Sequence, residues 1–519
     1  MTRPGDIAEL ALCCAALIVA ELRWLRVAQR EHYLAQPVLR FATRWWLGSP
    51  ANLTLLVAAV GGVVAATFRV WFGLASCAVL LVGPLGLTLR GKTAKLVWTA
   101  RLRRLGSATM AVSVIAGLAG GWDSGLVGSI VAVLALGLLA PLAVAVASLA
   151  VLPIEDRLGQ SYVDRAAVVV ARTAPRIVAI TGSYGKTSTK AYLAHLLGGS
   201  FAVVASPRSF NNRAGLARTV NELLVPGTDV LIAEMGTYGV GEIAAMVSWL
   251  PPEVAVITAI GPVHLERFKS LETTMRAKGE IAVGKAVVVV NDDDPYLAHF
   301  ADDVLLRGQR VLRCSALRQD ADVAVILGDA AIEVYVAGQL LGSADLGAAM
   351  PYVALSNIAC ALGAAVALGT DVAPLLGRLS TLPVVENRLT VRIATSGAKI
   401  LDDTYNSNPS GTTLALAALE GLSTPGHRTI VVTPGMVELG PLQDAANRAF
   451  AAKAATVATD LIVVGRTNRQ ALLSGASQGS SEVRLRQVRN RDAAVAIVRD
   501  ELGEGDVVLY ENDLPDHYA

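Results

Sequence analysis

Residues 177–197, IVAITGSYGKTSTKAYLAHLL, contain an apolar run, a short turn with two glycines, and a segment of helix-forming composition. Glycine has no Cβ atom, so Gly182 and Gly185 allow the backbone of the turn to approach an anion closely. Lys186 adds a positive charge, and Thr187 adds a hydroxyl group that suits Mg²⁺. The pattern therefore predicts a strand, a phosphate-binding turn and a helix, which together form the centre of a nucleotide-binding α/β domain. The match to the usual phosphate-loop pattern is partial, because isoleucine stands where that pattern has its first glycine.

The part of the chain before this turn is strongly apolar. The 519 residues are 53% hydrophobic and 17% charged, with a mean hydropathy of +0.50, which is typical of a membrane region joined to a soluble one. Runs long enough, or nearly long enough, to cross a bilayer are Leu53–Phe68, Val70–Leu89, Leu105–Trp122 and Ser124–Leu152, with Ile7–Ala20 as a shorter fifth. We therefore expect about five transmembrane helices in residues 1–152. Buried helices of a soluble core are the alternative.

Basic residues lie between these runs, in 23–44 and in 90–104. Because basic connections remain on the cytoplasmic side of a membrane, both segments are predicted to be cytoplasmic. Five spans then place everything after Pro153 in the cytoplasm, where ATP is available. The predicted localisation is that of a multi-pass protein of the cell membrane with cytoplasmic catalytic domains.

From Ile154 onward, apolar stretches alternate with helical ones. The expected strands are 230–233, 254–258, 286–290, 429–433, 461–464 and 507–510. Continuous runs of this kind are typical of buried parallel strands joined by crossover helices. A break near Leu382 divides this part in two. The predicted fold class is α/β: a P-loop NTPase-like parallel-sheet domain over 153–382 and a Rossmann-like domain over 383–519, preceded by the helical transmembrane region.

Polar residues follow several of the expected strands in a defined order. Glu234 ends one strand, where an NTPase holds a metal-binding carboxylate. His264 follows the next strand in AIGPVHLERF, Lys278 lies in MRAKGEI, and Asn291 ends the strand of VVVVNDDDP. Each residue alone is compatible with an ordinary loop or surface position. Their order along the chain is what indicates a function.

Together, these motifs resemble the Mur ligase family, the ATP-dependent amide-bond ligases of peptidoglycan precursor synthesis, and most closely its D-alanyl-D-alanine-adding (MurF) branch. The phosphate motif of that branch reads TGTxGKT, from which residues 181–187 depart only at Ser183. The NN–G loop, E-x-G, HLE, AKGEI and N-x-D-D motifs recur in the same order. So do DDTYNSNP at 402–409 and PGMVELG at 434–440, which is similar to GDMLELG in the family. The resemblance covers residues 154–510.

The resemblance implies a carbon–nitrogen ligase that forms ADP. In the family, ATP phosphorylates a substrate carboxylate, an amine attacks the acyl phosphate, and the intermediate collapses to an amide, ADP and phosphate. The implied cofactors are ATP and Mg²⁺, whose charge would stabilise the anionic oxygens together with Lys186. The family lysine of AKGEI is carbamylated by CO₂, and Lys278 falls on that position.

The functional positions of the family map onto four groups of residues. The catalytic group is Lys186, Lys278 and His264. The ATP-binding group is Gly182, Ser183, Tyr184, Gly185, Lys186, Thr187, Ser188, Asn291, Asn357, Arg388 and Asp403. The metal group is Thr187, Glu234, His264 and Lys278. The substrate-binding group is Asn211, Asn212, Tyr405, Asn406 and Asn408.

Besides Ser183, and Asn387 in place of the usual glycine beside Arg388, three features depart from the family pattern. Apolar runs replace the N-terminal domain that grips the UDP sugar, the His-Asn pair of the family is Ser356-Asn357, and the K-G-S-R ending is YENDLPDHY at 510–518. We therefore expect a carboxylate-bearing envelope precursor as substrate, in UDP-linked, lipid-linked or polymeric form, and an amino acid or a dipeptide as the amine. Membrane lipids are further expected partners, and nucleic acid is not, because no basic stripe with interleaved aromatics occurs. A polyamide synthetase of the poly-γ-glutamate type and a membrane NTPase switch or transport component remain the alternatives.

Overall fold

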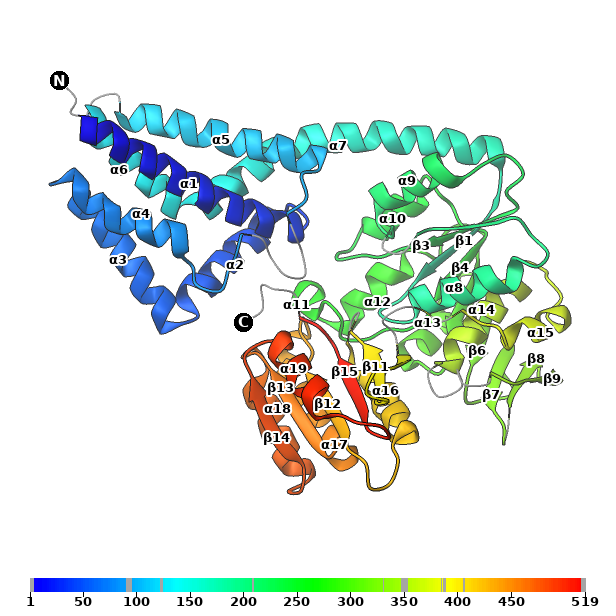
Figure 1. Ribbon diagram of the computed structural model, residues 1–519. Helices are drawn as coiled ribbons and strands as arrows, with labels where there is room; N and C mark the ends of the chain where they lie inside the picture. The colour runs from blue at the N-terminus through cyan, green and yellow to red at the C-terminus, as the bar shows by residue number, and fades with distance from the viewer. Residues whose placement is uncertain are drawn as a thin grey trace. The chain divides into compact units, whose positions relative to one another are not determined.

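The structure, a computed structural model, describes residues 4–89, 96–121, 125–207, 210–329, 331–346, 353–383, 385, 389–404 and 407–514. It divides into two compact units, Met1–Gln160 with Leu514–Ala519, and Ser161–Asp513. The elements of each unit are labelled in Figure 1.

The first unit is helical. Its elements are α1 (Pro4–Arg30), α2 (Ala35–Leu47), α3 (Pro50–Ala66), η1 (Val70–Phe72), α4 (Gly73–Val82), α5 (Ala100–Gly121), α6 (Gly125–Leu138) and the first part of α7 (Ala140–Thr173). Within the described residues, none of the helices alone has both the length and the apolar composition needed to cross a membrane. Two bent pairs meet that test on length and composition, α2 with α3 at a bend of 100° and α6 with α7 at 76°.

Two of the apolar runs are interrupted where one continuous helix was expected. The run Val70–Leu89 folds as η1 and α4, and α4 ends just before Gly83 and Pro84. The run Ser124–Leu152 bends between α6 and α7, where Pro141 lies in the first turn of α7. Proline has no N–H group, and its ring clashes with the preceding helical turn. The two prolines therefore account for both interruptions.

Arg23 and Arg26 were expected in a connection between two apolar helices, and the structure corrects this part of the expectation, while the cytoplasmic location stays a prediction. Both lie within α1 and are buried. The Arg23 guanidinium donates to the carbonyl oxygens of Leu80 (3.1 Å), Leu81 (3.0 Å) and Gly83. The last carbonyls of a helix have no partner within it. Arg23 therefore caps the C-terminal end of α4.

The second unit contains a nine-stranded sheet. Its strands are β1 (Arg176–Thr181), β2 (Val203–Ala205), β3 (Val230–Glu234), β4 (Val254–Ile257), β5 (Val287–Asn291), β6 (Val311–Ser315), β7 (Val323–Leu327), β8 (Ile332–Val336) and β9 (Gln339–Ala344). The order is β2-β3-β1-β4-β5-β6-β7-β8-β9, parallel from β2 to β7 and antiparallel for the last two pairs.

Helices cover both faces of this sheet. They are α8 (Lys186–Leu197), α9 (Arg213–Leu223), α10 (Glu242–Val247), α11 (Leu265–Phe268), α12 (Leu271–Gly279), α13 (Pro295–Leu306), α14 (Leu355–Ala367), η3 (Ala373–Leu375) and α15 (Leu376–Leu379). Residues of α8 and α14 form one apolar core with the sheet, and residues of α9, α10, α13 and the end of α7 form the other (Figure 1). Because both faces are buried, the central strands are almost wholly Val, Ile and Ala.

A six-stranded sheet follows, in the order β10-β11-β15-β12-β13-β14. Its strands are β10 (Thr390–Ile393), β11 (Lys399–Asp403), β12 (Thr429–Thr433), β13 (Asp460–Val464), β14 (Arg484–Val488) and β15 (Val507–Glu511). All neighbours are parallel except β10 and β11. Its helices are α16 (Pro409–Leu422), η4 (Gly440–Leu442), α17 (Gln443–Val457), α18 (Arg469–Gly479) and α19 (Arg491–Glu501).

The six strands expected from the sequence are confirmed as β3, β4, β5, β12, β13 and β15, each within about two residues at its ends. The α/β class and the two mainly parallel sheets are therefore correct. The parallel arrangement brings the C-terminal ends of β1, β3, β4 and β5 to one edge of the first sheet. In sheets of this kind, ligands bind at that edge.

Candidate active site

The phosphate turn joins β1 to α8, as expected. Gly182 and Gly185 have φ angles of 150° and 81°, which favour glycine. A Cβ atom on Gly185 would lie 2.2 Å from Oδ1 of Asn357. The Asn357 side chain, one of the predicted ATP contacts, therefore packs directly against the turn and leaves no room for a larger residue at Gly185.

Two lysines meet on one carbonyl of this turn. Nζ of Lys186 donates to the Gly182 oxygen at 2.7 Å, and Nζ of Lys278 donates to the same oxygen at 3.0 Å. Lys278 is buried at the end of α12, with 4% of its surface exposed. Burial, together with the neighbouring Lys186 charge, lowers the pKa of Lys278 well below its ordinary value. The structure therefore brings both predicted catalytic lysines to the phosphate turn.

Glu234 lies at the end of β3 and is at the centre of a polar network. Its carboxylate accepts from Oγ1 of Thr187 (3.2 Å), Nζ of Lys190 (2.8 Å) and Nδ2 of Asn211 (3.3 Å). Burial acts to raise the pKa of Glu234, but the Lys190 and Lys186 charges outweigh it and hold the pKa below its ordinary value. The carboxylate is thus ionised beside the Thr187 hydroxyl.

The loop after β4 is fastened to the phosphate turn. The backbone N–H of Gly261 donates to Oγ of Ser183 (2.9 Å), and the Ser183 N–H donates to the carbonyl oxygen of Ala259 (2.7 Å). A Cβ atom on Gly261 would overlap the hydroxyl end of the Tyr184 side chain, so this side chain packs directly against the loop backbone. The loop continues to His264, which is the N-cap residue before α11 and has a φ of 56°. The predicted histidine is therefore carried by a segment whose position the phosphate turn fixes.

Glu438, in the loop after β12 of the second sheet, contacts this loop. Nδ1 of His264 is hydrogen-bonded to Oε2 of Glu438, and the Leu265 N–H donates to the Glu438 carbonyl oxygen at 2.9 Å. The Tyr238 ring meets the His264 ring edge-on, with centroids 4.8 Å apart. The sequence motif that contains Glu438 was recognised, but no role was predicted for it.

The donor set suits Mg²⁺ rather than a metal held wholly by protein side chains. Among the residues that the structure describes, no group of three or more His, Cys, Asp or Glu side chains could hold a metal ion. Thr187 and Glu234 offer adjacent oxygen donors. Magnesium prefers oxygen ligands and is usually held by one or two carboxylates, with waters and substrate phosphates completing its shell. The residues present therefore fit a magnesium–nucleotide complex.

The remaining predicted residues lie in different surroundings. Asn291 ends β5 and is buried. Asn212 and Asn408 cap α9 and α16, because each side-chain oxygen accepts from a backbone N–H in the first turn, at 2.9 Å. These two asparagines thus have a local structural role whether or not they contact substrate. Arg388, Tyr405 and Asn406 lie outside the described residues.

Asp403 pairs with Glu511 across β11 and β15 at the C-terminal edge of the second sheet. Oγ of Ser407 donates to Oε1 of Glu511 at 2.6 Å, and Glu511 is fully buried. Burial and the nearby Asp403 raise the pKa of Glu511 well above its ordinary value. Glu511 lies in the segment that replaces the family's basic K-G-S-R ending, and its raised pKa favours the uncharged carboxyl group.

Lys190 was not among the site residues predicted from the sequence. It lies on α8, one turn beyond Lys186, and only the burial of that helix face makes it the charge partner of Glu234. Its position in the sequence gives little indication of this ion pair, because a lysine on a helix is usually exposed.

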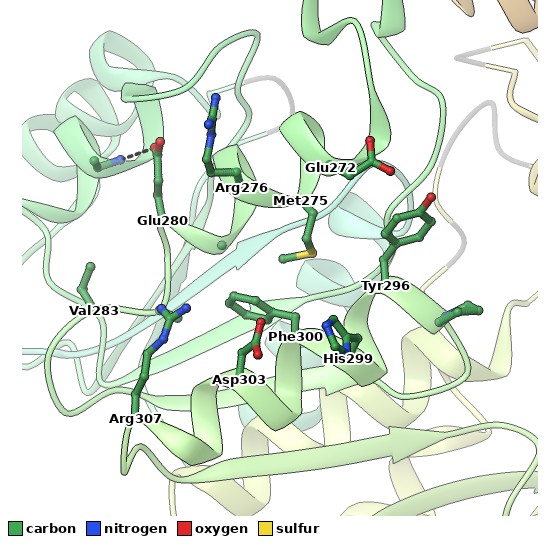
Figure 2. Close-up of a pocket in the computed structure, with 14 residues that line it drawn as sticks. Glu272, Met275, Arg276, Glu280, Val283, Tyr296, His299, Phe300, Asp303 and Arg307 are labelled. Atoms are coloured by element: carbon green, nitrogen blue, oxygen red, sulfur yellow. Dashed lines mark hydrogen bonds between the residues drawn. The ribbon is translucent and has the colours of Figure 1, made fainter.

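A pocket of about 880 Å³ lies apart from the phosphate turn, between α12 and α13. In Figure 2, Met275 and Phe300 are central among the side chains that line it, and charged side chains including Arg276, Asp303 and Arg307 lie around them. None of the predicted site residues lines it. The phosphate turn and the strand ends around it, rather than this pocket, therefore form the candidate active site.

Fold and site together define an ATP-dependent enzyme with a phosphate turn on a mainly parallel sheet and a second α/β domain. The model of the Mur ligase middle domain matches residues 180–368, and that of the Mur ligase glutamate ligase domain matches residues 387–510. The UDP-N-acetylmuramoyl-tripeptide–D-alanyl-D-alanine ligase of Mycobacterium leprae is 32% identical over 362 residues, which is 64% of this chain and 70% of that protein.

Solved structures of MurF ligases are similar to this chain. The MurF ligase of Thermotoga maritima in complex with ADP gives a TM-score of 0.57 at 26% identity, covering 68% of this chain and 80% of that one. A MurF structure from Acinetobacter baumannii gives 0.58 at 21% identity, covering 68% and 77%. This chain belongs to the Mur ligase family. It is therefore an ATP-dependent, ADP-forming acid–amino-acid ligase.

Proposed function

We propose that this ligase joins the carboxylate of a muramoyl-peptide precursor to the amine of a dipeptide, as a step in peptidoglycan synthesis. The Mycobacterium leprae relative is a UDP-N-acetylmuramoyl-tripeptide–D-alanyl-D-alanine ligase, which supports this substrate class. The observation that carries the proposal is the meeting of Lys186 and Lys278 on Gly182, beside the Thr187–Glu234 pair. An NTPase used only as a switch has no need of a second buried lysine at its phosphate turn.

The chemistry follows from this arrangement. A carboxylate oxygen of the substrate attacks the γ-phosphorus of ATP, the bond to the β-phosphate oxygen breaks, and ADP leaves. The amine nitrogen then attacks the acyl carbon, the bond to the phosphate oxygen breaks, and the amine gives up a proton. Lys186 binds and orients the phosphates, while Thr187 and Glu234 would hold Mg²⁺. The metal, when bound, neutralises charge on the transferring phosphoryl group.

We include carbamylation of Lys278 in the proposal. CO₂ reacts with a neutral amine, and burial lowers the pKa of Lys278, which favours the neutral form. A carbamate at this place would put an anion beside the Lys186 cation. Such an anion suits a second Mg²⁺, because this metal prefers oxygen ligands.

The proposal also places the enzyme at the cell membrane, with its catalytic domains in the cytoplasm. Support comes from the apolar first unit and from its two bent helix pairs of suitable length and composition. A reporter fused after Ala519 should read cytoplasmic, and an external reading would contradict this topology.

A UDP-linked precursor fits the proposal because the Mycobacterium leprae relative is named for one. A lipid-linked precursor fits it because the first unit is proposed to lie at the membrane. The experiment presents the full chain, in detergent, with ATP, Mg²⁺, D-alanyl-D-alanine and the same muramoyl tripeptide in either form. Mass spectrometry should detect the amide product from at least one of them. Preference for the lipid form would make the first unit part of substrate recognition, and preference for the nucleotide form would make it only a tether. Absence of an amide with both would contradict the proposed substrate class.

A further inference from the structure

The loop after β12, residues 434–439, is held rigidly within its own domain. The buried side chain of Asn447 accepts from the Met436 N–H (2.8 Å) and donates to the Met436 carbonyl oxygen (2.9 Å). The buried Asn468 donates to the carbonyl oxygens of Pro434 (2.9 Å) and Met436 (3.0 Å). Buried amides with all these bonds made fix a backbone strongly. The loop is therefore a preformed support, and Glu438 lies at its tip with a φ of 64°.

Glu438 contacts the loop after β4 at two points. Its carboxylate is hydrogen-bonded to Nδ1 of His264, and its carbonyl oxygen accepts from the Leu265 N–H at 2.9 Å. The backbone bond fixes the position of the two loops, and the side-chain bond fixes the orientation of the imidazole. One loop follows a strand of the first sheet, and the other follows a strand of the second. The orientation of His264 therefore depends on the relative position of the two domains.

The hydrogen bond at Nδ1 determines what the other ring nitrogen can do. An imidazole that donates from Nδ1 to a carboxylate keeps a free lone pair on Nε2, which is the usual state of a metal-binding histidine. In the described part of the chain, no group is hydrogen-bonded to Nε2 of His264.

We infer that Glu438 is a positioning residue that orients Nε2 of His264 toward the metal of the ATP site. Glu438 thereby couples metal binding to the position of the C-terminal domain. This inference rests on the proposed function, because it takes His264 as a metal neighbour. It adds a role for the VELG motif that follows β12, and it assigns to the second sheet a part in forming the site on the first.

The test measures Mn²⁺ binding, with Mn²⁺ replacing Mg²⁺ in the presence of ADP, by the electron paramagnetic resonance signal of free Mn²⁺. Glu438→Gly removes the carboxylate without backbone strain, since glycine tolerates the φ of 64°. The expected result is a Kd for Mn²⁺ raised about 10- to 100-fold. Glu438→Gln keeps an acceptor for Nδ1–H and should restore most of the affinity. Glu482→Ala, an exposed acid of the same domain, is the matched control and should change nothing.

The variants separate this inference from the proposed function. If His264→Ala weakens Mn²⁺ binding but Glu438→Gly and Glu438→Gln bind as the wild type does, Glu438 does not position His264 and the inference is wrong. If His264→Ala also binds Mn²⁺ normally, the metal role of His264 fails, and the inference fails with it. Thermal unfolding of each variant shows whether the fold is kept, and the Gln variant serves as the test if the Gly variant is unfolded.

Discussion

Lys186 and Lys278 donate to the same backbone oxygen, that of Gly182, although they come from α8 and α12. Two ammonium groups so close repel each other, and burial of Lys278 relieves the repulsion by favouring its neutral form. This relationship connects the phosphate turn to the AKGEI motif. It also gives a physical reason why a lysine there would react with CO₂.

The first prediction concerns Lys278. Lys278→Ala should lower ADP release by at least about 100-fold, a loss typical of removing one strong electrostatic contact from an active site. High bicarbonate or a short added carboxylate should restore part of the activity, because it can supply the missing anion. A coupled assay for ADP measures both effects. Full activity in the alanine variant would exclude a catalytic role for this lysine.

The second prediction concerns the buried ion pair of Lys190 and Glu234, whose side chains are 7% and 3% exposed. Lys190→Met would leave the Glu234 carboxylate buried without its strongest partner, and should destabilise the protein by about 3–5 kcal/mol. Urea unfolding of the full chain measures the loss. Glu222→Gln, which breaks the exposed pair of Arg218 and Glu222, should cost no more than about 1 kcal/mol. Equal effects of the two changes would contradict the importance of burial.

The third prediction concerns Gly185. Gly185→Ala adds a methyl group that would lie 2.2 Å from Oδ1 of Asn357, at a φ of 81°. We expect ATP affinity to fall by at least about 10-fold, because the turn must open where its amides face the phosphates. Gly227→Ala is the matched control, since φ is 89° there and a Cβ atom would meet nothing within 4 Å. Nucleotide titration should show normal ATP affinity in the control. Equal ATP affinity in both variants would be evidence against a phosphate-binding role for this turn.

The fourth prediction concerns Glu511 and pH. Its pKa is raised in the folded state by burial and by Asp403, so the folded protein holds this proton at pH values where the unfolded chain has lost it. Stability therefore falls as pH rises above about 4.3, the ordinary carboxyl value, until the folded pKa is passed. Glu511→Gln removes this loss, and should be more stable than the wild type at neutral pH but not near pH 4. Denaturant unfolding across this range measures the difference, and a constant difference at all pH values would refute the assignment.

The sequence indicated the parts of the molecule that depend on local pattern. Runs such as VAVI and VVVV, which alternate with helical stretches, indicate buried strands, and Gly182 and Gly185 indicate the phosphate turn. By contrast, the strands β8 and β9 carry exposed and half-buried residues without a continuous apolar run, and they were not expected.

Contacts between distant segments could not be predicted. Glu438 meets His264 across 174 positions of the chain, and Lys190 reaches Glu234 across 44. Arg23 illustrates the same limit, because its charge indicated a membrane boundary while its guanidinium caps α4. In each case the partner is chosen by the packing of whole elements, which no short motif encodes.

The most direct test of the account is the dependence of ADP release on the amine substrate. The full chain is supplied with ATP, Mg²⁺ and the muramoyl tripeptide in the form that it accepts, and D-alanyl-D-alanine is then added in steps. We predict that sustained ADP release rises with the dipeptide and equals the amount of amide formed, measured by mass spectrometry. ADP release that proceeds at the same rate without the dipeptide, with no amide formed, would contradict the account and indicate an NTPase that works only as a switch.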